Sequence, residues 1–204
     1  MSIVIVGAGS FGRELWCALQ AAGVFSYFVD DKIPDSETLA RIGARYAGTL
    51  DIVNSIDHYL IAFGSPEMRR RVDETLIARG CVAASAFVSP RAYCGSDIEI
   101  QEGAIVCPNS SLTTNIRIGR HVLINQNCSI GHDVKIGDYS VISPLTAISG
   151  GVHVEEDVFI GTGVSVLPNI KLGKRAVIGA GSVVVKDVLP DTTVVGVPAR
   201  VKNG

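Results

Sequence analysis

The sequence of 204 residues predicts a chain of two parts: a small α/β region over residues 1–82, and an all-β parallel β-helix over residues 83–204. Two observations support this prediction. In the second part an aliphatic residue returns at every sixth position, which is the hexapeptide period of a parallel β-helix. In the first part short β-branched strands alternate with stretches of helical spacing, which is typical of a small Rossmann-like parallel sheet.

The six-residue repeat runs without a break from Ile100 to Val184. Each unit makes one strand and one corner, and three units close a triangular coil, so that residues eighteen apart stack in inward ladders. Burial of one such side chain contributes roughly 1.5–3 kcal/mol, and the ladders should account for most of the stability of this part. The ladder positions are Ile100, Val106, Leu112, Ile118, Ile124, Ile130, Ile136, Ile142, Ile148, Val154, Ile160, Val166, Leu172, Ile178 and Val184.

Glycine often follows a ladder position, and we expect it there at corners that need a positive φ. These glycines are Gly119, Gly131, Gly137, Gly161, Gly173 and Gly179. The five cysteines are scattered and lack CxxC spacing, which argues against a disulfide framework or a zinc knot. Cys94 and Cys128 occupy inward repeat positions, where we expect them to act as small hydrophobic residues.

The composition predicts a soluble, cytoplasmic chain. It contains no apolar run of about 18 residues that would span a bilayer. The first residues lack the basic region and the small-residue cleavage site of a signal peptide. The formal net charge of −2 gives no indication of a basic surface for nucleic acid.

The first part reads as strands that alternate with helices. The expected elements are a strand over Ile3–Val6, a helix that ends near Ala22, strands over Phe25–Val29 and Tyr59–Phe63, and a helix over about Glu67–Ala78. A glycine-rich turn, Gly7 to Gly12, joins the first strand to the first helix. Because backbone N–H groups at a helix N-terminus carry partial positive charge, such a turn can bind a phosphate.

Asp30 and Asp31 end the second expected strand and can accept hydrogen bonds from ribose or sugar hydroxyls. A tight turn without a ligand, with two solvated aspartates, is the alternative interpretation. A nicotinamide dehydrogenase would use a similar turn. However, about 80 residues are few for a full dinucleotide fold, and a β-helix is a poor substrate domain for hydride transfer.

His132 and Asp133 are the most informative polar residues of the repeats. His132 follows a corner glycine, so its side chain should leave the coil. A neutral imidazole can accept a proton near physiological pH, and a neighbouring carboxylate favours its protonated form. A surface histidine beside a surface aspartate is the alternative. A zinc site is not expected, because His121, His132 and His153 lie at different phases of the repeat.

With these residues in view, the chain resembles the left-handed β-helix acyltransferases of the sialic acid O-acetyltransferase and nucleotide-sugar N-acetyltransferase group. The resemblance rests on the glycine-rich turn with its two aspartates, on the segment Ala62-Phe63-Gly64-Ser65 before an arginine-rich helix, on the repeats, and on Gly196-Val197-Pro198-Ala199-Arg200. The left-handed sense of the β-helix is implied by the resemblance alone.

The resemblance implies a homotrimer with active sites in clefts between adjacent β-helices and with acetyl-CoA, as co-substrate, extended along the coils. His132 matches the general base of the family, and Asp133 matches an acidic residue, often Glu, that modulates its basicity. Some relatives have a second histidine where Val141 stands. The positions that match acyl-donor contacts are Gly150, Thr162 and Ala180. The positions that match nucleotide-sugar contacts are Gly9, Ser10, Phe11, Asp30, Asp31 and Gly64.

We therefore expect direct acetyl transfer to the amino group of a nucleotide-linked amino sugar. In this hypothesis His132 removes a proton from the acceptor, and backbone N–H groups that include that of Gly150 hold the oxyanion. Two alternatives stay open. One is O-acetylation of a sialic acid or another sugar hydroxyl, and the other is a β-helix that binds ligands without catalysis.

Overall fold

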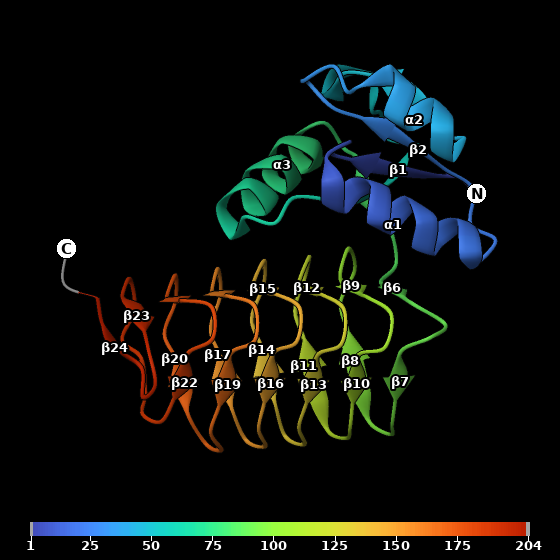
Figure 1. The fold of residues 1–204 in the computed structure, drawn as a ribbon. Helices are drawn as coiled ribbons and strands as arrows, with labels where there is room; N and C mark the ends of the chain where they lie inside the picture. Colours follow the sequence, from blue (N-terminus) through green and yellow to red (C-terminus); the bar gives the residue numbers. More distant parts are fainter. Residues whose placement is uncertain (1, 203–204) are drawn as a thin grey trace. The chain divides into compact units, whose positions relative to one another are not determined.

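The computed structural model describes residues 2–202 (Figure 1). The chain divides into two compact units, with the boundary between Ser85 and Ala86. The division falls after residue 85, whereas the change of period suggests residue 82. The physical reason is that strand β5 (Val82–Ala83) still pairs with strand β4 (His58–Ile61) in the sheet of the first unit.

The first unit is an α/β layer structure around a five-stranded parallel sheet. Its strand order is β3-β2-β1-β4-β5, with β1 at Ile3–Val6, β2 at Ser26–Val29 and β3 at Tyr46–Gly48. Its helices are α1 (Ser10–Ala21), α2 (Ser36–Ile42), the 3-10 turn η1 (Leu50–Ile52) and α3 (Pro66–Ala78). The sequence pattern misses α2, β3 and η1, because these elements are short and β3 contains no fully buried residue.

The strand order places a topological switch point between β1 and β4. Because the strands are parallel, their carboxyl ends share one edge of the sheet, and the chain leaves β1 and β4 toward opposite sides. Open α/β sheets bind ligands at such an edge. The core beneath it consists of buried aliphatic residues from the strands and α3, among them Val4, Val29, Ile61, Val72 and Leu76.

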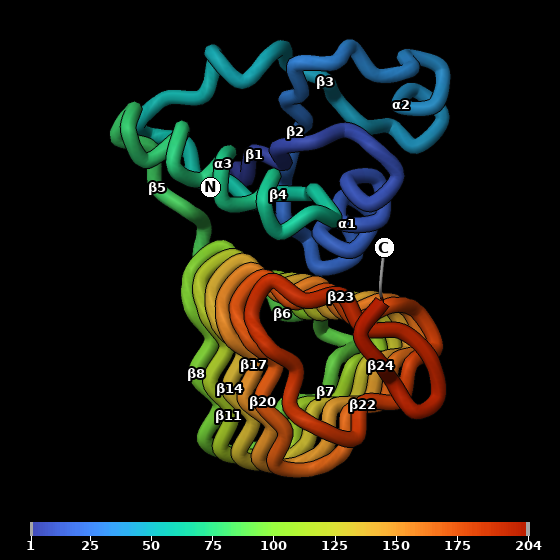
Figure 2. The backbone as a smooth tube through the Cα atoms, turned by 90° about the vertical axis from the view of Figure 1, so that its left-hand side faces the viewer, coloured from blue at the N-terminus to red at the C-terminus, as the bar shows by residue number. Residues whose placement is uncertain are grey.

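The second unit is a parallel β-helix whose coils follow one another along the axis (Figure 2). Three sheets, each named here by its first strand, form its sides. The β6 sheet contains β6 (Phe87–Val88), β9 (Ile105–Val106), β12 (Leu123–Ile124), β15 (Val141–Ile142), β18 (Phe159–Ile160), β21 (Val177–Ile178), β23 (Thr193–Val195) and the antiparallel β24 (Arg200–Val201).

The β7 sheet contains β7 (Tyr93–Cys94), β10 (Ser111–Leu112), β13 (Ser129–Ile130), β16 (Ala147–Ile148), β19 (Ser165–Val166) and β22 (Val183–Val184). The β8 sheet contains β8 (Ile98–Ile100), β11 (Ile116–Ile118), β14 (Lys135–Ile136), β17 (His153–Val154) and β20 (Lys171–Leu172). Residues eighteen apart pair directly, as Ile118 does with Ile136. This register confirms the predicted coil, and its ladder residues form one continuous buried core.

The corner glycines have a different function from the predicted one. Positive φ falls three residues after a ladder position, as at His121 and Asp133, and none of the six glycines directly after a ladder position has it. These glycines instead lie against the next coil. A Cβ on Gly131 would lie 2.7 Å from the nitrogen of Gly150, and a Cβ on Gly161 would lie 2.6 Å from the nitrogen of Ala180. The close approach of coils therefore excludes a side chain.

Cys94 also departs from the prediction. Its register partner is the ladder residue Leu112, yet Cys94 is exposed while Cys128 is buried. Strand β7 is the edge strand of its sheet, so no preceding coil covers Cys94. Over residues 2–202, the helices are too short or too polar to cross a bilayer.

Candidate active site

The glycine-rich turn forms the start of α1 at the carboxyl edge of the first unit's sheet. Gly9 is the N-cap residue with extended dihedral angles, and no side chain caps the helix. Gly7 has a φ of 110°, and a Cβ on Gly12 would collide with the Gly7 carbonyl oxygen. Gly9 is exposed and has open space beside it. The N–H groups of Ser10 and Phe11 in the first helical turn therefore have no competing side-chain acceptor.

Asp30 and Asp31 hold the backbone around this turn. The two carboxylate oxygens of Asp30 accept hydrogen bonds from the N–H groups of Ala8 at 2.8 Å and Lys32 at 2.9 Å. Asp31 accepts one from the N–H of Leu50 at 2.9 Å. Asp30 thus links the glycine-rich turn that follows β1 to the end of β2. Since each carboxylate oxygen can accept a second hydrogen bond, this structural function leaves capacity for a ligand.

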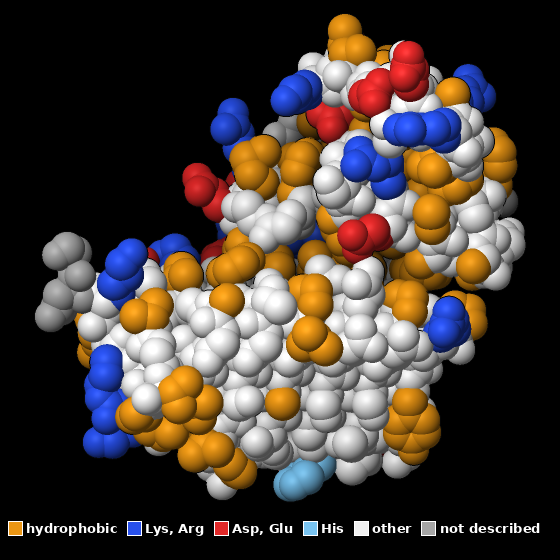
Figure 3. Space-filling model, viewed as in Figure 1, with side chains coloured by type: hydrophobic (Ala, Val, Ile, Leu, Met, Phe, Trp, Pro, Cys, Tyr) orange, Lys and Arg blue, Asp and Glu red, His pale blue; other side chains and the backbone are white. Residues whose placement is uncertain are grey.

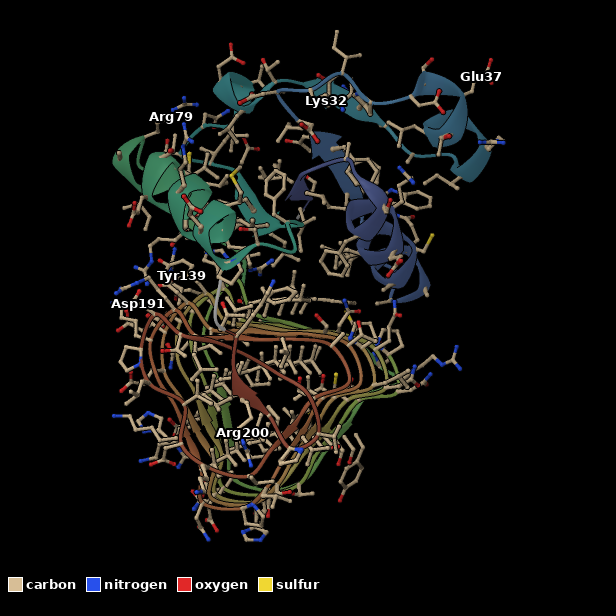
Figure 4. The ribbon with its side chains drawn as sticks, turned by 60° about the vertical axis from the view of Figure 1, so that its left-hand side comes forward. Lys32, Glu37, Arg79, Tyr139, Asp191 and Arg200 are labelled. Atoms are coloured by element: carbon tan, nitrogen blue, oxygen red, sulfur yellow. The ribbon has the colours of Figure 1, made fainter. Side chains whose placement is uncertain are left out.

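A cavity of about 600 Å³ opens beside Asp31, between η1 and α3. Its lining includes Asp51, Met68, Arg71 and Arg79. Arg79, at the end of α3, reaches toward the η1 segment (Figure 4), where its Nη1 donates to the Leu50 carbonyl at 3.0 Å. The cavity combines carboxylates, guanidinium groups and apolar surface, which suits a ligand with both a flat ring and polar edges.

Gly64 lies at the same edge, after β4, and the buried Arg69 sets its orientation. Arg69 Nη1 donates to the carbonyl oxygens of Ile61 at 2.6 Å and Phe63 at 3.1 Å. In a planar trans peptide the N–H points away from the carbonyl oxygen. The N–H of Gly64 therefore points away from Arg69, and a Cβ on Gly64 would meet only open space. The position of Arg69 within an arginine-rich helix did not reveal this function.

His132 and Asp133 occupy a corner of the β-helix, between β13 and β14. Their side chains are 65% and 53% exposed, so the imidazole lies outside the coil. His132 Nδ1 lies 2.6 Å from Asp133 Oδ2. Asp133, although shorter than the glutamate of many relatives, thus reaches the imidazole. This hydrogen bond with His132 is the main reason why the pKa of Asp133 is lowered.

Two residues from neighbouring coils complete this corner. Asn115 Nδ2 donates to the other oxygen of Asp133 at 2.5 Å, which lowers the pKa of Asp133 further. On the opposite side, a Cβ on Gly150 would lie 2.5 Å from both Nε2 and Cε1 of His132. Sequence reasoning missed Asn115; its signal is the spacing of eighteen residues before Asp133, which places the two residues one above the other.

Thr162 and Ala180 stack at a different corner, between the β6 and β7 sheets. Both are exposed, and the N–H of Gly181 donates to the Thr162 carbonyl at 2.8 Å. The structure thus gathers the predicted residues at three places: the carboxyl edge of the first unit, the corner of His132 and Gly150, and the corner of Thr162 and Ala180. The last two corners flank the β7 sheet of one chain.

The remaining histidines of the repeats lie away from this corner. His121 is buried, and its ring stacks on that of Tyr139 with centroids 6.0 Å apart. His153 is exposed on the outward side of β17, and Val141 is buried in β15. Over residues 2–202, no group of three His, Cys, Asp or Glu side chains is arranged to hold a metal ion.

Comparisons with known proteins agree with this architecture. Residues 115–150 and 151–186 match the family model "Bacterial transferase hexapeptide (six repeats)". Among the curated proteins no sequence matches the chain. Among solved structures, WeeI from Acinetobacter baumannii AYE is 30% identical with a TM-score of 0.87, and the alignment covers 99% of this chain and 100% of that one.

A second similar structure is PerB from Caulobacter crescentus in complex with CoA and GDP-perosamine. It is 26% identical with a TM-score of 0.87, over 100% of this chain and 98% of that one. The acetyltransferase domain of PglB from Neisseria gonorrhoeae FA1090, in complex with acetyl coenzyme A, is 24% identical with a TM-score of 0.74, over 98% of each chain. The chain therefore belongs to the hexapeptide-repeat acetyltransferases that fold as a left-handed parallel β-helix.

Proposed function

We propose that this enzyme moves an acetyl group from acetyl-CoA to the amino group of a nucleotide-linked amino sugar, with His132 as general base. The observation that carries the proposal is the exposed His132–Asp133 pair, with a Nδ1–Oδ2 distance of 2.6 Å, beside the side-chain-free Gly150. The CoA and GDP-perosamine bound to PerB support the choice of substrates.

The hydrogen bond with Asp133 assigns the two imidazole nitrogens. Because an ionised carboxylate only accepts, Nδ1 carries the proton and Nε2 is the basic atom. As the acceptor amine attacks the thioester carbonyl, Nε2 removes its proton, and Asp133 stabilises the imidazolium that forms. Collapse of the tetrahedral intermediate breaks the C–S bond, and the imidazolium returns the proton to the sulfur. Backbone N–H groups at the corner, including that of Gly150, hold the oxyanion.

The first unit binds the nucleotide in this proposal. The N–H groups of Ser10 and Phe11 beside Gly9, together with that of Gly64, hold the diphosphate, which suits an anion at a helix N-terminus. The cavity beside Asp31 receives the nucleoside, while Asp30 keeps the glycine-rich turn in place. Because nucleotide sugars and acetyl-CoA are made in the cytoplasm, we assign the reaction to that compartment.

We further propose a homotrimer whose sites form between copies. The donor positions Thr162 and Ala180 and the base His132 lie on two corners that flank the β7 sheet, so one chain alone does not bring them together. The outward residues of this sheet are small and uncharged at Ser111, Ser129, Ala147 and Ser165.

The outward side of the β8 sheet is different, because every strand of it presents a charged residue or a histidine. These residues are Glu99, Arg117, Lys135, His153 and Lys171. Figures 1 and 3 show the second unit from the same side. The face turned to the viewer includes strands β10 to β19, and it carries few charged side chains. A smooth, uncharged face allows the close approach that an interface core requires.

The test is acetyl transfer by His132→Ala, followed as release of the CoA thiol with nucleotide-linked amino sugars. Loss of the general base should lower kcat by roughly 10²–10⁴-fold while the affinity for acetyl-CoA stays nearly unchanged. His153→Ala, which removes another exposed histidine of the repeats, is the matched control and should keep full activity. Unchanged turnover of His132→Ala, or transfer to sugar hydroxyls and not to amines, would contradict the proposal.

The nucleotide class is identified by a thermal-shift screen with UDP, GDP and dTDP. A ligand that binds only the native state raises the melting temperature by mass action. At least one nucleoside diphosphate should do so, and a Gly64→Val chain should lose the effect. If none of the three nucleotides raised the melting temperature, the proposal of nucleotide binding would be contradicted.

A further inference from the structure

We propose that Asn115 is a positioning residue for the transfer reaction: it fixes the Asp133 carboxylate so that this group orients His132. The inference rests on the proposed function of His132 as general base. Asn115 belongs to the coil before Asp133, and nothing in its local sequence marks it as part of the site.

The geometry of the corner supports this inference. Asn115 Nδ2 lies 2.5 Å from Asp133 Oδ1, while Asp133 Oδ2 lies 2.6 Å from His132 Nδ1. Each carboxylate oxygen thus receives one donor, one from the same coil and one from the preceding coil. Only the NH₂ end of the Asn115 amide can face an ionised carboxylate, because the carboxylate only accepts. The three side chains form a chain of hydrogen bonds that ends at the base.

The backbone explains why an asparagine stands here. Asn115 and Asp133 have left-handed φ values of 52° and 61°, a conformation that Asn and Asp tolerate better than other residues with a side chain. Their own N–H groups donate to the carbonyl groups of Ser96 and Thr114, at 3.3 and 3.2 Å. The neighbouring coils therefore satisfy the main chain without using the Asn115 amide, which is left to contact Asp133.

Positioning is needed because the pair is exposed. The Asp133 side chain is 53% exposed, and an exposed carboxylate held by one hydrogen bond rotates readily about its side-chain bonds. A second donor on its other oxygen selects the rotamer in which Oδ2 faces the imidazole. Asp133 contacts His132 through one oxygen and Asn115 through the other, so the orientation of this one carboxylate decides the electrostatic support of the base.

The experiment compares Asn115→Ala, Asp133→Ala and the double variant. Asn115→Ala should lower kcat roughly 3- to 10-fold, because a loss of this size corresponds to the net free energy of one ordinary hydrogen bond. The KM of both substrates should stay unchanged. A carboxylate near an imidazole favours its protonated form, so the acid limb of the pH–rate profile should move to lower pH in Asp133→Ala. It should move in the same direction, by less, in Asn115→Ala.

The double variant separates positioning from a structural function. If Asn115 acts through Asp133, the double variant should be no slower than Asp133→Ala, because coupled residues are not additive. Asn109→Ala is the matched control: it removes an exposed asparagine with a left-handed φ of 62° and should keep the wild-type kcat and profile.

Three outcomes would overturn the inference: wild-type kcat in Asn115→Ala, an unmoved acid limb, or additive losses in the double variant. If His132→Ala is inactive while any of these is found, the inference about Asn115 fails and the proposed function stands. If His132→Ala retains full turnover, the proposed function itself fails.

Discussion

At the scale of single residues, the chemistry of His132 depends on neighbours that are distant in sequence. Asp133 alone is adjacent to it. Asn115 comes from the preceding coil and Gly150 from the following one, and both approach through the spacing of eighteen residues. The local sequence therefore specifies His132 and Asp133, whereas the stacking of coils specifies the orientation of their side chains.

The first prediction concerns Gly150→Ala. The added methyl group would lie 2.5 Å from Nε2 and Cε1 of His132, so the imidazole must move away. A displacement of about 1 Å can cost on the order of 10²-fold in rate, and we expect kcat to fall by that order while the melting temperature changes little. Steady-state kinetics and thermal denaturation check both parts. In a His132→Ala background the same substitution should have no further effect on kcat, and an additional loss there would argue against this explanation.

At the scale of elements, the corners of the β-helix divide two requirements between two positions. The position directly after a ladder residue contacts the next coil and often needs glycine for space. The position two residues further along has the left-handed φ and accepts Asn, Asp, His or glycine, among others. A six-residue period reveals that corners exist, but it does not tell which of the two requirements a given glycine meets.

The second prediction distinguishes these requirements. In Gly137→Ala the new Cβ would lie 2.7 Å from backbone atoms of Glu155 and Glu156, whereas Gly163, with a φ of 69°, has nothing within 4 Å of a new Cβ. Gly163→Ala should lower the free energy of unfolding by about 1–2 kcal/mol through backbone strain. Gly137→Ala should lower it by more, because neighbouring backbone must shift. Urea titrations measure both, and equal losses would contradict the assignment of a steric function to Gly137.

At the scale of the whole molecule, the enzyme combines an α/β unit, to which we assign nucleotide binding, with a β-helix, to two corners of which we assign the base and the donor site. The corners flank the smooth β7 sheet, and a second copy against that sheet is the simplest way to join a base from one chain to a donor site from another. In a ring of three copies each chain contacts the next through two different surfaces, and closed rings of this kind occur among soluble oligomers.

The third prediction tests this shared site by complementation. Chains with His132→Ala lack the base, and chains with Ala180→Trp block the donor corner, so each alone should be inactive. In randomly mixed trimers, three of every four assemblies contain both chains and have one intact site of three, which gives about a quarter of wild-type activity. Co-expression with two affinity tags and an acetyl-transfer assay measures the recovery. An inactive mixture that purifies with both tags would contradict sites formed between copies.

The repeat and its register are predictable from the amino-acid sequence, because a period of six and a ladder of aliphatic residues are local properties of the chain. The pair His132–Asp133 is visible there as two adjacent residues after a corner glycine. The sequence also placed β1, α1, β2, β4 and α3 within a few residues. It did not determine α2, β3 and η1, which are short and only partly buried, nor the reason for the corner glycines. Those features depend on contacts between segments that the sequence keeps apart. The folded structure alone reveals that Asn115 and Gly150 lie next to the His132–Asp133 pair, that Asp30 holds the glycine-rich turn, and that Arg69 turns the N–H of Gly64 outward.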